Sequence, residues 1–494
     1  MSVTETLAAF IAGHREVPTE VAAMAKRLIL DSTGCALGAI DSDLGAIALS
    51  FARAQGAGPE TILGTDIAAG PAVAAYVNAR LVNVLDMDET YMVLGHHANC
   101  ALGAALALAK TCELSGETLL RAFIIGYEVG ARAANYMGVA LKVDDAGSVA
   151  GWNFPGPILG TYAACASAAV CLGLTQTQVE NALGICAEYL PSNAGDLWEA
   201  GRKRASLPTV KYEDCGINAQ MGLTAAWMAR AGITGTLGVF DPDNTLAETA
   251  RPGAVARPGA MVDGLGTDWR LMRTSFKPWP SCRWFHYALT ALETALQGET
   301  LDPARIDKVE LWSSGSSCFF ASPEIGEHLV MDASFSVPHS AAMMLLGIPA
   351  GPAWFDERIV RRPDVEALRH KVSVSLAPEV SNPANWGDYQ RWGEADAPMT
   401  LPSRARITLG DRVLEARSDV AKGDIPDAGA ALSDDEILAK FRALTLPAGQ
   451  AVPGWQANVS TLAARLLSLE EEPSVSALLA SCAPATFQAQ EVSK

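Results

Sequence analysis

The sequence predicts a mainly α-helical protein with two domains: a large all-helical domain made by both ends of the chain, and a smaller α+β domain inserted between them. Up to about residue 240 the chain is rich in Ala, Leu and Met, with apolar residues at helical spacing. After about residue 265 apolar and polar residues alternate as they do in strands, and the tail returns to a helical pattern. We therefore place the all-helical domain at residues 1–267 and 429–494 and the α+β domain at residues 268–428.

The helical part of this prediction depends on four segments in the first half of the chain. They are 19–40, 100–116, 116–137 and 221–232, and several of them are apolar on nearly every side. A helix of that kind is packed on all its faces in a folded protein. Ser115 and Thr175 stand where helix N-caps are expected, because their hydroxyl groups can accept hydrogen bonds from the first free backbone N–H groups.

Strands are expected in the middle of the chain, and a helix in its tail. Residues 306–314 and 370–380 alternate apolar and polar positions, and 403–420 predicts two strands around a Gly410-Asp411 turn. Ser433 and the three acidic residues after it predict a helix N-terminus, since acidic side chains favour the positive end of the helix dipole. In the most economical arrangement the C-terminal helices pack back on the first domain.

Composition and charge exclude several classes of protein. The net charge is −18, which argues against a nucleic-acid partner because phosphate binding needs a basic surface. The 10 cysteines form no CxxC pair, and the N-terminal segment lacks the basic start, apolar run and cleavage site of a signal peptide. The longest weakly polar run, 160–174, is too short to span a bilayer. We expect a cytoplasmic protein with reduced thiols and no membrane partner.

Residues 85–100, LDMDETYMVLGHHANC, gather acidic and histidine side chains directly before an apolar helical run. We expect no metal there, because His96 and His97 are adjacent, so their side chains diverge, and no HxxxH, HExxH or EF-hand spacing occurs. A solvated loop remains an alternative, since Asp and Asn favour turns and caps. The chain also lacks GxSxG, GxxxxGK[ST] and a complete GxGxxG after a strand, which argues against esterases, kinases and nicotinamide enzymes.

A second cluster of reactive side chains lies in SFKPWPSCRWFHYAL, residues 275–289. Lys277, Cys282, Arg283 and His286 occur close together, and two prolines fix the backbone before the cysteine. We expect a helix from Cys282 onward, which would put Cys282 and His286 one turn apart on the same face. The alternative is the start of a core helix whose Lys and Arg side chains extend to the surface.

Two further positions complete the set of candidates. Lys211, in LPTVKYEDCGINAQMG, precedes a predicted helix, although taken alone it is an ordinary surface cation. His339 lies in ASFSVPHSAAMMLLG, a short predicted helix, and has an apolar setting, as His96 and His286 do.

Taken together, these segments resemble the MmgE/PrpD family, which contains 2-methylcitrate dehydratase, cis-aconitate decarboxylase and iminodisuccinate epimerase. The similarity covers almost the whole chain in the family's order, from LILDSTGCALGA through LDMDET…GHHAN, VKYEDCGINAQMG and FKPWPSCRWFH to AKGDIP…SDDEILAKF. The resemblance implies a large helical domain with a smaller α+β lid and a site in the cleft between them. It also implies a homodimer, no metal or organic cofactor, and a small anionic di- or tricarboxylate as substrate.

The resemblance implies roles for particular residues. Asp86, Thr90 and His96 occupy the family's LDxxDT…GH positions, Lys211 its pocket lysine, and Lys277 and His286 its K-P-Y-x-x-C-x-x-x-H motif. Three positions depart from the family. Asn153 is nearest to a common family histidine, Cys282 stands where the decarboxylase branch has another histidine, and His339 stands where tyrosine is usual.

The branches of this family share one difficult step, which is forming or collapsing a carbanion next to a carboxylate. We expect His96 to be the base, with Asp86 orienting its other ring nitrogen. Lys211 and Lys277 suit carboxylate binding and stabilisation of the enediolate. The substrate-binding residues are expected to be Thr90, Asn153, Arg283 and His339.

A second acid/base group decides which reaction follows. Cys282, His286 and His339 are the candidates, and Cys282 is expected to have a lowered pKa because Lys277 and Arg283 lie near it in sequence. We predict a hydro-lyase of the 2-methylcitrate dehydratase type, with an epimerase or isomerase second and a decarboxylase third. A carboxylate-binding protein without catalysis is the non-enzyme alternative, because Asn153 replaces a family histidine.

Overall fold

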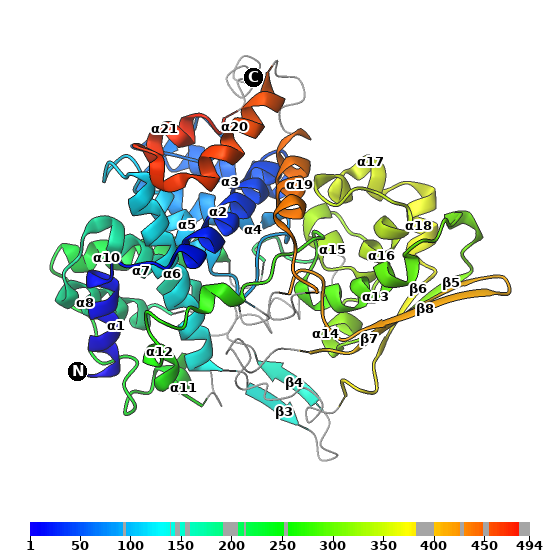
Figure 1. Ribbon diagram of the computed structural model, residues 1–494, viewed down its shortest axis with the longest axis horizontal. Coiled ribbons are helices and arrows are strands. Elements are labelled where there is room, and N and C mark those ends of the chain that lie inside the picture. Colours follow the sequence, from blue (N-terminus) through cyan, green and yellow to red (C-terminus); the bar gives the residue numbers. More distant parts are fainter. Residues whose placement is uncertain are drawn as a thin grey trace.

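The fold has two unequal parts: helices from both ends of the chain form one, and a four-stranded sheet with its own helices forms the other (Figure 1). The computed structural model describes residues 1–91, 95–138, 140–143, 149–153, 159–190, 206–211, 214–250, 255–381, 400–424, 429–447 and 454–483. The prediction of a mainly α-helical fold with a smaller α+β part is confirmed. The residue limits of the two domains stay a prediction.

The helices before residue 265 form most of the larger part. In chain order they are α1 (Val3–Gly13), α2 (Thr19–Ala39), α3 (Asp43–Ala54), α4 (Pro71–Val84), α5 (Ala98–Leu106), α6 (Gly116–Met137), α7 (Gly160–Leu172), α8 (Gln176–Glu188), α10 (Cys215–Arg230), α11 (Leu246–Ala250) and α12 (Gly259–Val262). Ser115 and Thr175 cap α6 and α8, as predicted. Of the described helices, none alone is long and apolar enough to cross a bilayer, although α2 and α3 pass that test as a bent pair.

Helix α7 lies in the core of this part, and all of its residues are buried. It packs against α6 and α10, and glycines make both approaches close. A Cβ at Gly126 of α6 would lie 2.7 Å from the carbonyl oxygen of Ala163, and one at Gly222 of α10 would lie 2.3 Å from that of Thr161. Neighbours on every side are what a helix without a polar face requires.

The C-terminal helices return to the larger part. They are α19 (Asp434–Thr445), α20 (Trp455–Leu467) and α21 (Val475–Ala480), and α19 and α20 pack against α2. Ser433 caps α19 as predicted. Glycines of α2 let α19 approach closely: a Cβ at Gly34 would lie 2.9 Å from the Phe441 side chain, and one at Gly38 would lie 3.1 Å from that of Leu444. In Figure 1, α19 lies where the helical part meets the part with the sheet.

The smaller part is built on a sheet with strand order β6-β5-β7-β8. Its strands are β5 (Lys308–Ser313), β6 (Val372–Leu376), β7 (Ser403–Leu409) and β8 (Arg412–Ser418). Because β5 and β6 are parallel, a crossover joins them, and it contains α14 (Gly315–Phe319), α15 (Leu329–Ser334), α16 (Val337–Leu345), α17 (Glu357–Val360) and α18 (Pro363–Arg369). β7 and β8 form the predicted hairpin, with Gly410 at φ +57° in its turn. Helix α13 (His286–Leu296) packs on β7 and β8.

Two short ribbons depart from the all-helical prediction for residues 1–267. β1 (Glu60–Thr61) pairs with β2 (Ala68–Ala69), and β3 (Ala140–Val143) pairs antiparallel with β4 (Val149–Asn153). The second ribbon has a signal in the sequence, because short apolar runs flank DDAGS, whose residues are typical of turns.

Candidate active site

The predicted acid/base segment connects α4 to α5, and its described residues, 85–91 and 95–97, are buried. Asp86, Asp88 and Glu89 are 0% exposed, and Thr90 is 2% exposed. Asp86 has φ +51°, an uncommon backbone conformation for a residue with a side chain. The alternative of a solvated loop is therefore wrong. Charged groups buried to this degree need opposite charges or hydrogen-bond donors around them.

Two lysines from distant parts of the chain meet at Asp86. The Nζ of Lys211 lies 2.8 Å from the Oδ1 of Asp86, and the Nζ of Lys277 lies 3.3 Å from the same oxygen. Each ammonium group also donates to a backbone carbonyl, Lys211 to that of Asn83 (2.8 Å) and Lys277 to that of Asp86 (3.0 Å). Burial alone would raise the pKa of Asp86, but the two lysines outweigh it and hold that pKa at about 2. Asp86 therefore stays ionised and holds the two ammonium groups side by side.

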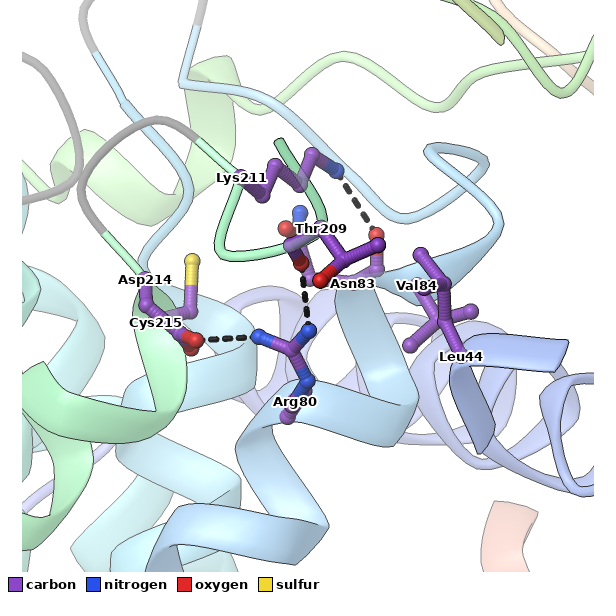
Figure 2. Close-up of a pocket in the computed structure, with 8 residues that line it drawn as sticks. All are labelled: Leu44, Arg80, Asn83, Val84, Thr209, Lys211, Asp214 and Cys215. Carbon is purple, nitrogen blue, oxygen red and sulfur yellow. Dashed lines mark hydrogen bonds and ion pairs between the residues drawn. The ribbon is translucent and has the colours of Figure 1, made fainter. Parts of the chain in front are cut away.

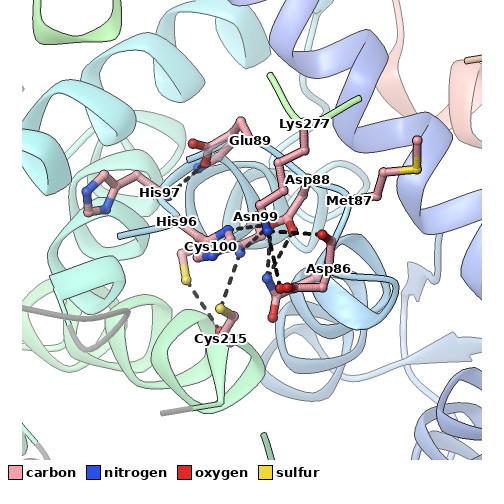
Figure 3. Close-up of polar contacts among 12 residues, drawn as sticks. Asp86, Met87, Asp88, Glu89, His96, His97, Asn99, Cys100, Cys215 and Lys277 are labelled. Carbon is pink, nitrogen blue, oxygen red and sulfur yellow. Dashed lines mark hydrogen bonds and ion pairs between the residues drawn. The ribbon is translucent and has the colours of Figure 1, made fainter. Parts of the chain in front are cut away.

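His96 pairs with Asp88, two residues beyond the partner that the sequence predicted. The Nδ1 of His96 lies 3.1 Å from the Oδ2 of Asp88 (Figure 3). The side-chain amides of Asn83 and Asn99 each donate to Asp88 at 3.0 Å. Burial would raise the pKa of Asp88, but His96 outweighs it and holds that pKa well below its usual range. The ionised Asp88 fixes the imidazole so that its Nε2 is the nitrogen turned away from the carboxylate.

The prediction that Asp86 orients His96 is wrong for a backbone reason. The left-handed conformation at Asp86 directs its carboxylate to the lysines, and the chain then returns Asp88 to the imidazole. Two carboxylates of one loop thus hold two kinds of group: Asp86 the cations, and Asp88 the acid/base ring.

The neighbouring residues Glu89 and His97 support the start of α5. One carboxyl oxygen of Glu89 accepts hydrogen bonds from the backbone N–H groups of His97 (2.9 Å) and Ala98 (2.7 Å), and Tyr127 donates to the other oxygen (3.1 Å). The ring of His97 packs edge-on against Tyr127. Burial lowers the pKa of His97 to about 3, so its imidazole is neutral near pH 7. Of the two adjacent histidines, His96 is the one that pairs with a carboxylate.

An ion pair braces the segment that carries Lys211. Arg80 of α4 pairs with Asp214, which also caps α10, and Arg80 donates to the Thr209 carbonyl at 2.6 Å. Figure 2 shows these side chains and Lys211 around a small cavity of about 10 Å³, which is room for about one water molecule. Lys211 has φ +56°, so both partners of the Lys211–Asp86 pair have left-handed backbones. The brace holds Lys211 in this conformation.

The segment that carries Lys277 is tied to the acid/base loop through its backbone. Thr90 and Ser275 exchange backbone hydrogen bonds of 3.0 and 2.8 Å, and the hydroxyl group of Ser275 donates to Asp424 at 2.7 Å. Arg283 pairs with the same aspartate. The hydroxyl group of Thr90 is buried and has no hydrogen-bond partner among the described residues. The structure therefore brings Lys277 and Thr90 to the loop, whereas it places the guanidinium of Arg283 against Asp424.

The helix predicted from Cys282 begins later. Cys282 has a non-helical backbone (φ −54°, ψ 134°) and donates its N–H to the Ser334 carbonyl (3.0 Å). Residues Arg283–Phe285 form a 3-10 turn, and α13 begins at His286. The prediction that Cys282 and His286 share a helical face is therefore wrong. The predicted low pKa of the thiol is wrong as well. Burial raises the pKa of Cys282 to about 12, Asp86 adds to the rise, and Lys277 does not offset them.

Cys282→Ser is expected to leave kcat within about threefold of the wild-type value, because a thiol with this pKa does not exchange protons near neutral pH. Steady-state kinetics on whichever polycarboxylate the protein is found to turn over provide the measurement. A loss of most activity, with the melting temperature unchanged, would restore the thiol to the mechanism.

The two other predicted histidines are buried in the smaller part. The Nε2 of His286 lies 3.2 Å from the carbonyl oxygen of Ser281, and the Nε2 of His339 lies 2.8 Å from that of Trp354. Burial lowers the pKa of both rings, that of His339 to about 3. Both imidazoles are therefore neutral near pH 7.

His286 and His339 have different charged neighbours. Lys277 and Asp86 are near enough to His286 to influence its titration, whereas the charged group near His339 is Arg369. The structure thus brings His286 to the edge of the lysine cluster and does not bring His339 there. The side chain of Asn153 lies outside the described residues; its backbone ends β4, in register with Ala140.

The polar residues around Asp88 were missed at the sequence level. Asn83 and Asn99 each lie in a nearly apolar helix, where a buried amide must find a hydrogen-bond partner. A polar residue inside an apolar helix was the signal that could have found them. In the described part of the chain, His, Cys, Asp and Glu side chains form no group of three or more that could hold a metal ion.

Comparison with known proteins adds a second line of evidence. Residues 5–256 match the MmgE/PrpD N-terminal domain, and residues 279–454 match the MmgE/PrpD C-terminal domain. The chain is 26% identical over 394 residues to a cis-aconitate decarboxylase of Homo sapiens, and the matched region covers 76% of this chain and 77% of that protein. It is 25% identical over 464 residues to a cis-aconitate decarboxylase of Mus musculus (90% and 86% covered) and 26% identical over 393 residues to one of Aspergillus terreus (75% and 77% covered).

Proposed function

Since this chain belongs to the MmgE/PrpD family, we propose that it is a lyase that acts on a small di- or tricarboxylate at the carbon next to a carboxylate, without a metal or organic cofactor. One observation carries the proposal. The ammonium groups of Lys211 and Lys277 meet at Asp86, and the same loop carries His96 oriented by Asp88. The cations for an anionic substrate thus contact the same buried segment that carries the group for proton transfer.

The lysines are assigned to the substrate's carboxylates. A carboxylate placed against their ammonium groups forms charge-assisted hydrogen bonds, which are shorter and stronger than neutral ones. The same cations stabilise the negative charge that spreads from the reacting carbon onto its neighbouring carboxylate. Because Asp86 and the loop carbonyls fix both ammonium groups before substrate arrives, little reorganisation is needed in the transition state.

Decarboxylation fits the described ionisable groups best, because it needs a single proton. The bond between the carbon and the departing carboxylate breaks, CO2 leaves, and the electron pair spreads toward the carboxylate held by Lys211 and Lys277. Protonated His96 then gives its Nε2 proton to carbon and becomes neutral, and solvent restores the proton. The names of the relatives, cis-aconitate decarboxylases, support this choice and suggest an unsaturated tricarboxylate as substrate.

Dehydration, the reaction predicted first from the sequence, is the second candidate. The residue at position 282 favours dehydration, because this chain has a cysteine where the decarboxylase branch of the family has a histidine. Dehydration also needs an acid on the far side of the substrate to protonate the departing hydroxide. Cys282 and His286 are poor donors, the first because its pKa is about 12 and the second because burial keeps its ring neutral.

NMR in D2O over a panel of unsaturated, hydroxy- and amino-polycarboxylates tests the proposal. We expect an unsaturated tricarboxylate of the cis-aconitate type to lose CO2 and gain one deuteron at carbon, with the rate unchanged by EDTA. A new olefin signal from a hydroxy acid would identify a dehydratase instead, and exchange of one proton with inversion would identify an epimerase. Calorimetric binding of these acids without turnover or exchange would overturn the enzyme proposal.

A further inference from the structure

Three buried lysines from different regions of the chain donate to backbone carbonyls at the end of α4 and the start of the acid/base loop that follows it, between residues 83 and 87. Lys211 donates to Asn83 (2.8 Å), Lys277 to Asp86 (3.0 Å) and Lys440 to Met87 (2.6 Å). The first two also contact the Asp86 carboxylate and belong to the proposed site. Lys440 comes from the C-terminal helix α19 and pairs with Asp31 of α2, whose Oδ1 lies 2.6 Å from its Nζ.

Lys440 lies on the core-facing side of α19. Its neighbours on that side are Ile437, Phe441 and Leu444, and the side chain is 5% exposed, against 0% for Asp31. A buried ion pair loses much of its attraction to desolvation, and apolar residues of similar volume commonly stabilise a core as well or better. The pair therefore points to a role other than stability.

Lys440 also donates a hydrogen bond to the backbone carbonyl of Met87. This residue stands between Asp86 and Asp88, so the direction of its carbonyl is coupled to the directions of both carboxylates. Asp86 has φ +51°, a conformation that is uncommon for a residue with a side chain, so the contacts around this peptide group help to hold it. Lys277 holds the carbonyl before Met87 and Lys440 holds that of Met87 itself, so two successive peptide groups are fixed by cations from separate segments.

We propose that Lys440 is a positioning residue: from α19 it fixes the peptide group between Asp86 and Asp88, so that one carboxylate faces the two lysines and the other faces His96. The inference rests on the proposed function, in which these carboxylates arrange the reacting groups. The close packing of α19 on Gly34 and Gly38 sets the distance from α19 to α2 and thus the reach of the Lys440 side chain. Burial would lower the pKa of Lys440, but Asp31 outweighs it, so the ammonium group stays charged.

The test replaces the pair rather than breaking it. Asp31→Asn/Lys440→Met removes the donor to Met87 without leaving a buried charge. The matched control is Lys26→Met/Glu470→Gln, because that pair (2.7 Å) also joins α2 to the C-terminal segment but is partly exposed. Melting temperature, kcat, KM and the ring N–H signal of His96 in histidine-labelled protein are measured for both. Lys440→Arg serves as a second variant, since it keeps the charge beside Asp31 and moves the donor away from Met87.

We expect Asp31→Asn/Lys440→Met to melt near the wild-type temperature, to lose about tenfold or more in kcat with KM within about threefold, and to shift the His96 signal. The control should change none of these. If the first variant does not fold, the same kinetic and spectral changes in Lys440→Arg support the inference. Folded variants with wild-type kcat and an unmoved His96 signal overturn it. If the wild-type protein turns over no polycarboxylate, the proposed function fails, while the His96 signal still tests the positioning role.

Discussion

Replacing His96 by alanine is expected to lower kcat by about 100- to 10,000-fold, the range that removal of a general acid or base usually gives. KM should change by less than about threefold, because the lysines, not the imidazole, hold the substrate's carboxylates in the proposed mechanism. Asp88→Asn should also lower kcat, since a neutral amide neither fixes the ring nor stabilises its protonated form as the carboxylate does (Nδ1 to Oδ2, 3.1 Å). Steady-state kinetics with the substrate found by NMR give both values.

His97 supplies the matched control for this prediction. It is the adjacent residue of the same loop, is 0% exposed, and packs edge-on against Tyr127. His97→Ala should lower the melting temperature through lost packing, yet leave kcat of the folded protein within about threefold. A near-normal kcat in His96→Ala would remove this ring from the mechanism, and an equal loss in the two variants would show that damage to the loop, not proton transfer, explains the result.

The elements of the fold could be predicted from the sequence because the signals are local. The hairpin β7–β8 follows from alternating residues around Gly410-Asp411, and the start of α19 from Ser433 with its acidic first turn. The ribbon β3–β4 was missed because its strands are short and interrupt a long helical region. The start of α13 was predicted four residues early, at Cys282, because a 3-10 turn precedes His286 and sequence periodicity does not distinguish it from α-helix.

The sequence predicted which residues belong to the site better than it predicted which of them pair with each other. Asp86, His96, Lys211 and Lys277 were singled out in the sequence and given roles by the resemblance, and the structure brings all four together at one loop. Which carboxylate faces which group depends on the left-handed backbone at Asp86, and no sequence motif here signals that conformation. The pKa of the Cys282 thiol was also beyond prediction from the sequence. Two cations near it in sequence suggested a low pKa, whereas burial in the fold raises it.

The two lysines of the site give the second large effect. Lys211→Met and Lys277→Met are each expected to weaken binding of a tricarboxylate by roughly 10- to 100-fold, which corresponds to the loss of one charge-assisted hydrogen bond. Each should also lower kcat, because the missing cation no longer stabilises the developing charge. Titration calorimetry with citrate measures the binding affinity separately from turnover, and steady-state kinetics measure the change in kcat.

The lysines are replaced one at a time because both of them neutralise the buried carboxylate of Asp86. Each leaves this carboxylate with one lysine, whereas removal of both would leave a buried charge unpaired, at a cost of about 3–5 kcal/mol. The double variant should therefore fold only when Asp86→Asn accompanies it. Lys422→Met is the control, since it also removes one positive charge, but Lys422 pairs with Glu293 (2.9 Å) in a partly exposed ion pair and not with Asp86. Citrate binding that falls equally in Lys422→Met would trace the effect to net charge, and binding unchanged in Lys211→Met and Lys277→Met would separate both ammonium groups from the substrate.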